Sequence, residues 1–144
     1  MNAVVQALTV SGRAGTLLGQ GAQSDMELLH LVRRGVPVRA YRAFTRHLEI
    51  PSALIAPEST MRRRLRDNSG TFSLEESERL VRIARAFALA IETFGDEERA
   101  RLWFTTPESY LPGEPNISPL QMCATEAGGR LVESRLRQSQ YGFF

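Results

Sequence analysis

The sequence contains no lysine, because all 18 of its basic residues are arginine. A Walker A phosphate-binding loop and a Schiff-base enzyme both depend on a lysine amine, so both classes are excluded. The only cysteine, Cys123, cannot form a disulfide within the chain and is typical of a reducing compartment. Together with His30 and His47, it does not have the spacing of a zinc site. We therefore expect neither a metal nor a cofactor.

Long apolar runs are also missing, and none approaches the roughly 18 residues of a membrane span. The N-terminal residues lack the basic start and the apolar stretch of a signal peptide. Hydrophobic residues make up 42% of the chain and charged residues 24%, as in soluble globular proteins. No segment alternates β-branched with polar residues over the length of a strand. We expect an all-α, cytoplasmic protein with no membrane partner.

Charge of opposite sign prevails in the two parts of the chain. Residues 24–70 hold nine arginines and five acidic residues, whereas residues 71–144 hold eight arginines and eleven acidic residues. A basic front part beside an acidic back part favours two different partners.

The sequence of the front part predicts a series of short helices. The small, Gly-rich residues 1–23 are expected to form a flexible leader. Ser24 and Glu27 have the spacing of a capping box that opens the first helix, and Gly35 is placed to end it. Pro37 suits the first turn of a second helix.

The back part begins with the longest expected helix. Ser73 and Glu76 form a second capping box at its start, and Gly95 is placed to end it. Asp96 can cap the helix that follows. That helix carries Trp103, which we expect in the core because large aromatic residues are usually buried.

A helix-turn-helix pattern lies near the end of the front part. A short apolar helix from Ser52 to Ala56, a turn at Pro57–Ser59 and an arginine-rich helix ending at Arg66 follow one another. Met61 and Leu65 would anchor the last helix, leaving its arginines largely outward. A solvated basic face is the alternative interpretation. The residues that would contact DNA are Thr60, Arg62, Arg63, Arg64 and Arg66.

Aromatic residues gather at the C-terminus, after a last helix that Thr125 can cap. Tyr141, Phe143 and Phe144 are three of the final four residues, although chain ends are usually polar. They either dock onto their own domain or anchor another protein, since aromatic residues and arginine are frequent hot spots of interfaces.

Several landmarks of the back part resemble the Xre/MbcA/ParS antitoxin family, and residues 26–70 resemble the Xre-type helix-turn-helix that precedes this domain. The landmarks are Phe72–Leu80, Phe94–Asp96, Ala100–Trp103, Ser118–Leu120, Thr125–Gly128 and Gln140–Gly142. The resemblance implies three segments: a leader over 1–23, an Xre-like helix-turn-helix bundle over 24–70 and a helical toxin-binding domain over 71–144.

The resemblance further implies an antitoxin that is not an enzyme and that blocks the active site of a RES-domain, NAD-degrading toxin. It also implies a homodimer within the toxin–antitoxin complex and binding to operator DNA. The toxin contacts that it implies are Arg130, Glu133, Ser134, Arg135, Gln138, Tyr141, Phe143 and Phe144. One alternative is a free-standing helix-turn-helix repressor whose acidic part only dimerises, and another is a scaffold protein with a vestigial DNA domain.

Overall fold

The computed structural model describes residues 9–109, 113 and 115–140, and this part of the chain is helical, as predicted. The elements are α1 (Val10–Leu17), α2 (Asp25–Arg34), α3 (Val38–Thr45), the 3₁₀ helix η1 (Ser52–Leu54), α4 (Glu58–Arg66), α5 (Leu74–Phe94), α6 (Glu97–Thr105), α7 (Pro119–Met122) and α8 (Glu126–Gln140). Within the described residues, β-pairing is limited to two isolated bridges, Pro37 with Thr71 and Glu108 with Ile117. None of the helices described is long and apolar enough to cross a membrane.

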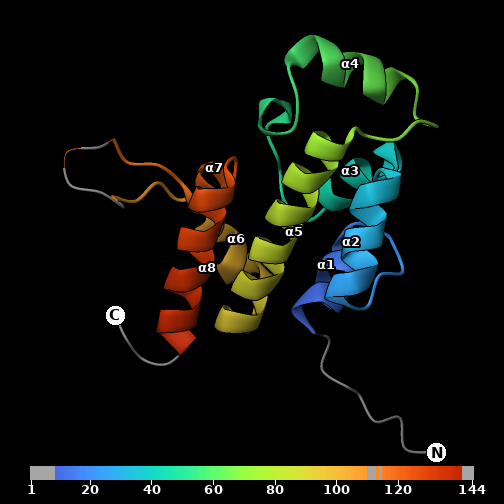
Figure 1. Cartoon of the computed structure of the whole chain (residues 1–144). Coiled ribbons are helices and arrows are strands. Elements are labelled where there is room, and N and C mark those ends of the chain that lie inside the picture. The colour runs from blue at the N-terminus through green and yellow to red at the C-terminus, as the bar shows by residue number, and fades with distance from the viewer. Residues whose placement is uncertain (1–8, 110–112, 114, 141–144) are drawn as a thin grey trace, which may run out of the picture.

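The central element is α5, a helix of 21 residues (Figure 1). The predicted capping box is present: Ser73 Oγ accepts the Glu76 N–H at 3.2 Å, and the Glu76 carboxylate accepts the Ser73 N–H at 2.8 Å. Gly95 ends the helix with a φ of 71°, a conformation that glycine adopts without strain. Helices α1 and α2 pack on one side of α5, and α6 and α8 pack on the other.

One aromatic row crosses α5 and joins the front and back parts. Phe87 of α5 lies between Phe44 of α3 and Phe104 of α6, with ring-centroid distances of 6.2 Å and 5.5 Å. All three side chains are fully buried. Aromatic pairs at these distances stabilise a core beyond the area that they bury. The two parts of the chain therefore share one hydrophobic core.

Helix α1 lies within residues 1–23, which the sequence had indicated as a flexible leader. Thr9 Oγ1 caps this helix by accepting the Gly12 N–H at 3.0 Å, and Ala14 and Leu17 are buried against the core. The expectation of a flexible leader is therefore wrong for residues 9–23.

The glycines of this segment permit close packing. A Cβ built on Gly15 would lie 2.2 Å from the backbone oxygen of Ala22, in the connection from α1 to α2. Only a residue without a side chain lets the two backbones approach in this way. Composition alone indicated flexibility, because it does not show which surface a glycine faces.

Helix α2 forms one of the two hydrogen bonds of its predicted capping box. Ser24 Oγ accepts the Glu27 N–H at 3.1 Å, but the Glu27 carboxylate accepts the N–H of Gln23, and the second half of the capping box is not formed. Gly35 ends α2 with a φ of 91°. The Phe72 backbone oxygen lies 2.9 Å from where a Cβ of this glycine would be. The turn from α2 to α3 thus packs closely against the segment that leads into α5.

The segment between α3 and α5 differs from the predicted helix-turn-helix in detail. The helix expected over Ser52–Ala56 is a single 3₁₀ turn, and α4 begins directly after Pro57, inside the expected turn. Ser59 and Thr60 lie in the first turn of α4, which has no side-chain cap. Proline accounts for both differences: it disfavours helical backbone in the residue before it, and its own φ suits a helix start.

Helix α6 begins as predicted, with Asp96 Oδ1 accepting the Glu98 N–H at 3.3 Å. Trp103 is half-buried, however, and lies at the edge of the core with its ring centroid 5.8 Å from that of Phe94. Its neighbour Phe104 is fully buried, as is Ala100 one turn earlier in this helix. Successive side chains on a helix point about 100° apart, so only one of the two can face α5 directly.

Helix α8 also starts at its predicted cap, since Thr125 Oγ1 accepts the Gly128 N–H at 3.0 Å. A Cβ on Gly128 would lie 1.9 Å from the backbone oxygen of Met122, so glycine is needed for the tight turn from α7 to α8. Val132 and Leu136, one turn apart, are buried on the side that faces the core. The opposite side of α8 faces solvent.

Candidate functional site

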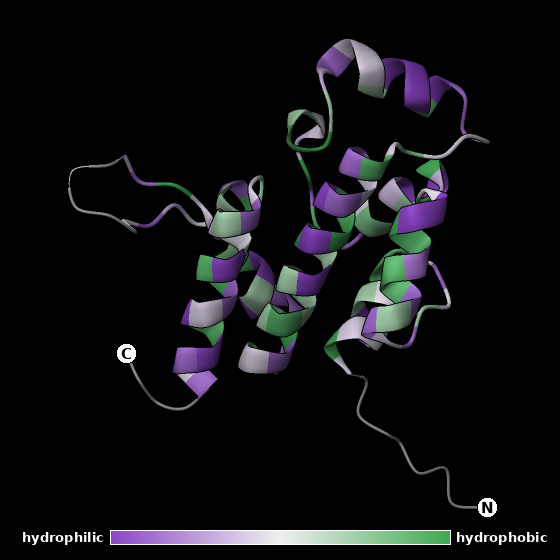
Figure 2. Ribbon diagram, in the orientation of Figure 1, coloured by the Kyte–Doolittle hydropathy of each residue, from purple (hydrophilic) through white to green (hydrophobic). Residues whose placement is uncertain are grey.

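Three of the four arginines of α4, Arg62, Arg63 and Arg66, are exposed and are hereafter called the outward row. The helix lies at one end of the molecule, and its ribbon is largely hydrophilic (Figure 2). Arg62 forms an i, i+4 ion pair with Glu58 at 3.0 Å, and both side chains are exposed. Arg63 and Arg66 are exposed and make no hydrogen bond or ion pair to any other residue that the structure describes. Guanidinium groups presented in this way can reach phosphates.

Arg64 does not belong to this outward row, contrary to expectation. Its guanidinium lies 3.0 Å from Glu76 Oε1, and the side chains of the two residues are 28% and 9% exposed. Thr60 is also partly buried, one residue before the buried Met61. The rotation of about 100° per residue turns positions 60 and 64 towards the bundle and positions 62, 63 and 66 away from it.

Two further arginines, which the sequence analysis did not single out, tie the ends of this segment to the bundle. Arg42 of α3 donates to the Leu65 carbonyl at 2.7 Å and to Asn68 Oδ1 at 2.9 Å. Arg79 of α5 donates to the Ile55 carbonyl at 2.8 Å. These contacts join residues 23 to 26 positions apart, so no local pattern in the sequence could have revealed them. Arg42, Arg64 and Arg79 are hereafter called the arginine anchor.

A second candidate surface is a groove of about 440 Å³ between α2, α5 and α8. Two predicted contacts, Arg130 and Glu133, lie on the α8 side of this groove. Leu29, on the α2 side, is 42% exposed. The groove thus combines apolar and charged groups and is bordered by elements from both parts of the chain.

The remaining predicted contacts on α8 do not line this groove. Arg135 forms an ion pair with Glu108 at 3.7 Å, in the segment that precedes α7. Ser134 and Gln138, one turn apart, are exposed. The predicted α8 contacts are therefore spread around the solvent-facing side of one helix, and only Arg130 and Glu133 among them line the groove. The aromatic residues Tyr141, Phe143 and Phe144 lie outside the described residues.

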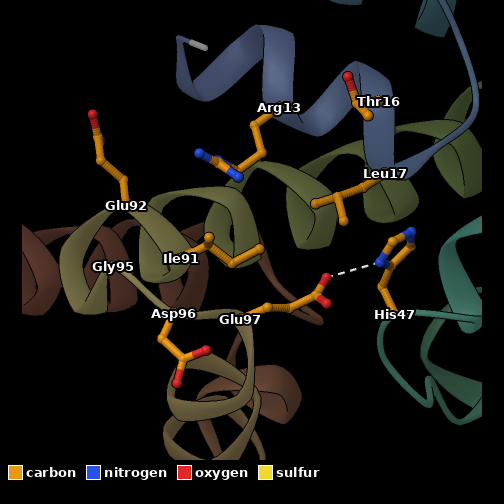
Figure 3. Close-up of a pocket in the computed structure, with 9 residues that line it drawn as sticks. All are labelled: Arg13, Thr16, Leu17, His47, Ile91, Glu92, Gly95, Asp96 and Glu97. Atoms are coloured by element: carbon orange, nitrogen blue, oxygen red, sulfur yellow. Dashed lines mark hydrogen bonds and ion pairs between the residues drawn. The ribbon is translucent and has the colours of Figure 1, made fainter. Parts of the chain in front are cut away.

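A second hollow, of about 570 Å³, lies where α1, the end of α5 and the start of α6 meet (Figure 3). His47 Nδ1 lies 2.8 Å from Glu97 Oε1 at its edge, and Arg101 donates to the His47 carbonyl at 2.7 Å. These contacts tie the end of α3 to α6. No group of His, Cys, Asp or Glu in the described residues has an arrangement that could hold a metal ion.

Cys123 lies in the core and is not placed for covalent chemistry. Burial raises the pKa of its thiol to about 12, although the Arg82 guanidinium acts in the opposite direction. The nucleophilic form of cysteine is the thiolate, which is therefore scarce at neutral pH. Arg82 donates instead to the carbonyls of Cys123 and Ala124, at 3.2 Å and 3.3 Å, and so ties α5 to the turn before α8.

The sequence matches two known domain families, which meet within α5. Residues 27–85 match the antitoxin Xre-like helix-turn-helix domain. Residues 89–142 match the antitoxin Xre/MbcA/ParS C-terminal toxin-binding domain. The first range contains most of α2, all of α3 and α4, and the arginine anchor, and the second contains α6 to α8.

Two curated relatives carry the same name, Antitoxin Xre. The one from Yersinia enterocolitica is 29% identical over 133 residues, which cover 88% of this chain and 87% of the relative. The one from Pseudomonas putida is 32% identical over 89 residues, which cover 62% of this chain. The alignment spans 54% of the Pseudomonas putida protein, about half of its length.

Proposed function

Because this chain belongs to the Xre/MbcA/ParS antitoxins, we propose that it neutralises a RES-domain toxin that degrades NAD, by binding the toxin and obstructing its active site. The single observation that carries the proposal is the match of the segment from the second half of α5 through α8 to a toxin-binding domain. The chain acts as a binding protein in this proposal, and catalysis is left to the toxin.

The α8 side of the α2–α5–α8 groove supplies one part of the proposed toxin-binding surface. Arg130 pairs with Glu126 at 3.4 Å, and both side chains are about three-quarters exposed. Exposed pairs of this kind contribute little to stability, so Arg130 is free to exchange its partner for a group on the toxin. Arginine also binds carboxylates in a bidentate manner, so an acidic side chain of the toxin is the partner that Arg130 takes in this proposal.

The C-terminal aromatic residues supply the second part in this proposal. The described part of α8 ends at Gln140, and Tyr141, Phe143 and Phe144 follow directly. Aromatic side chains at an interface are frequent hot spots. We expect removal of residues 140–144 to abolish neutralisation while the protein stays folded, because the described core ends with Leu136.

The front part is proposed to bind operator DNA through the outward row of α4. Arg62, Arg63 and Arg66 face solvent, and the helix-turn-helix match covers this segment. A homodimer is part of the proposal, since a two-fold protein reads two half-sites of an operator.

A purified mixture of the chain and its cognate toxin tests the first proposal. NAD hydrolysis should fall to the background rate at equimolar chain, and the double variant Arg130→Ala, Glu133→Ala should restore hydrolysis in part. Arg99→Ala, an exposed arginine of α6 that pairs only loosely with Asp96 at 4.0 Å, is the matched control. Undiminished hydrolysis with an excess of folded wild-type chain would overturn the proposal in favour of a free-standing repressor.

A further inference from the structure

Helix α3 carries a second row of arginines. Arg39, Arg42 and Arg46 follow at intervals of three and four, and Arg46 keeps helical backbone angles at the end of the helix. Such positions lie on one face of a helix. All three residues are exposed, whereas Val38, Ala40, Tyr41 and Phe44 fill the buried side.

This row lies beside the exit of α4. Its middle member, Arg42, contacts the Leu65 carbonyl and Asn68, the residues at which α4 ends and the next turn begins. The start of α3 is joined to the same connection, because the Val38 N–H donates to the Gly70 carbonyl at 2.9 Å. The carboxylate of Asp67, at this junction, accepts a hydrogen bond from Ser69 Oγ at 2.7 Å.

The row is not balanced by acidic groups of its own helix, since the sequence of α3, VRAYRAFT, contains none. The side chains of Arg39 and Arg46 make no hydrogen bond or ion pair within the part of the chain that the structure describes. Like charges spaced four residues apart destabilise a helix slightly, as Arg42 and Arg46 do here. Arg42 is held by its contacts with Leu65 and Asn68, but Arg39 and Arg46 have no such partners, as is typical of a surface that meets an anionic partner.

We propose that Arg39 and Arg46 extend the DNA-binding surface from α4 onto α3, where they contact phosphates of the duplex backbone. This inference rests on the proposed binding of DNA by α4. Arg42 connects the two rows: it holds the end of α4 in place and lies between the two phosphate contacts. Charge continuity with α4 favours a nucleic acid over an acidic protein as the occupant.

The test measures binding of a fluorescently labelled DNA duplex from the region upstream of the gene over a series of salt concentrations. The slope of log K against log salt should decrease in magnitude by about 0.9 for each lost phosphate contact, hence by about 1.8 for Arg39→Ala, Arg46→Ala. The control is the double variant Arg99→Ala, Arg137→Ala, which also removes two positive charges, one from α6 and one from α8. It should keep the wild-type slope.

Three outcomes would overturn the inference, and each leads to a different conclusion about the α3 row or about DNA binding. If the wild-type chain binds DNA and the α3 variant keeps its slope, the α3 row is not part of the interface and the α4 proposal stands. If the α3 variant keeps its slope but fails to inhibit the toxin, the row belongs to the toxin-binding surface. If the wild-type chain binds no duplex at all, the proposed DNA binding itself is wrong and the inference falls with it.

Discussion

Helices α1 and α4 are nearly equal in length but are held to the bundle by different means. Five of the eight residues of α1 are buried, whereas Met61 is the only buried residue among the nine of α4. Contacts of α1 with α5 are apolar and close. Those of α4 depend on the arginine anchor, in which charged side chains reach backbone carbonyls and the Glu76 carboxylate.

The difference indicates that the two helices belong to different cooperative units. Apolar burial couples α1 to the global free energy of unfolding, because its residues are part of the shared core. Few buried contacts and solvent-accessible polar ties are typical of segments that open locally. The helix proposed to meet DNA is thus the less firmly held of the two, and four experiments test this contrast.

The largest effect is expected for Leu17→Ala in α1. Leu17 is 4% exposed, and truncation of a buried leucine lowers the free energy of unfolding by about 3 kcal/mol. Urea unfolding followed by circular dichroism measures the change. A loss below about 1 kcal/mol would place α1 outside the cooperative core and remove the contrast with α4.

Gly15→Ala should have the next largest effect, about 2 kcal/mol, because the added methyl group would meet the Ala22 backbone oxygen. Gly21→Ala is the matched control, since no atom lies within 4 Å of the Cβ that it would add. The same unfolding experiment compares the two variants. Equal stability of both would show that close packing of α1 on the returning chain is not required.

A smaller and local effect is expected for Arg64→Ala. Removing this guanidinium leaves the Glu76 carboxylate without its cation, at a cost of about 1–2 kcal/mol. Arg63→Ala, on the outward side, should change stability by less than about 0.5 kcal/mol. Hydrogen exchange should show faster opening of α4 in the first variant alone. Similar exchange in both variants would contradict the assignment of Arg64 to the anchor.

The smallest perturbation is chemical labelling of cysteine. Cys123 should resist iodoacetamide at neutral pH, because burial both shields the thiol and raises its pKa to about 12. A cysteine introduced by Ser59→Cys on exposed α4 should react freely and serves as the positive control. Labelling at Cys123 as fast as at position 59 would mean that the core around α7 and α8 opens as readily as α4.

Local signals in the sequence predicted much of the secondary structure. Ser73, Asp96 and Thr125 cap the helices that they were expected to cap, and Gly35 and Gly95 end theirs. Each of these interactions joins residues no more than four positions apart. A capping side chain and the amide that it accepts can therefore be recognised from spacing alone.

The candidate site was predictable only in part, for the same reason. The outward positions of Arg62, Arg63 and Arg66 follow from the helical period once Met61 is taken as the buried residue. Arg64 was misplaced because its partner, Glu76, lies twelve residues away in another helix. The proposed role of the C-terminal aromatic residues stays a prediction.

The sequence by itself determined the all-α class, most helix ends and the two-part organisation that the domain matches confirm. These features depend on short-range hydrogen bonds and on the periodicity of apolar residues. Only the tertiary structure decided that residues 10–17 of the glycine-rich start form a helix and that Phe104, not Trp103, fills the core position of α6. It also decided that three arginines hold α4 in place. Each of these outcomes depends on which surface a residue meets across the bundle, and that surface is supplied by distant parts of the chain.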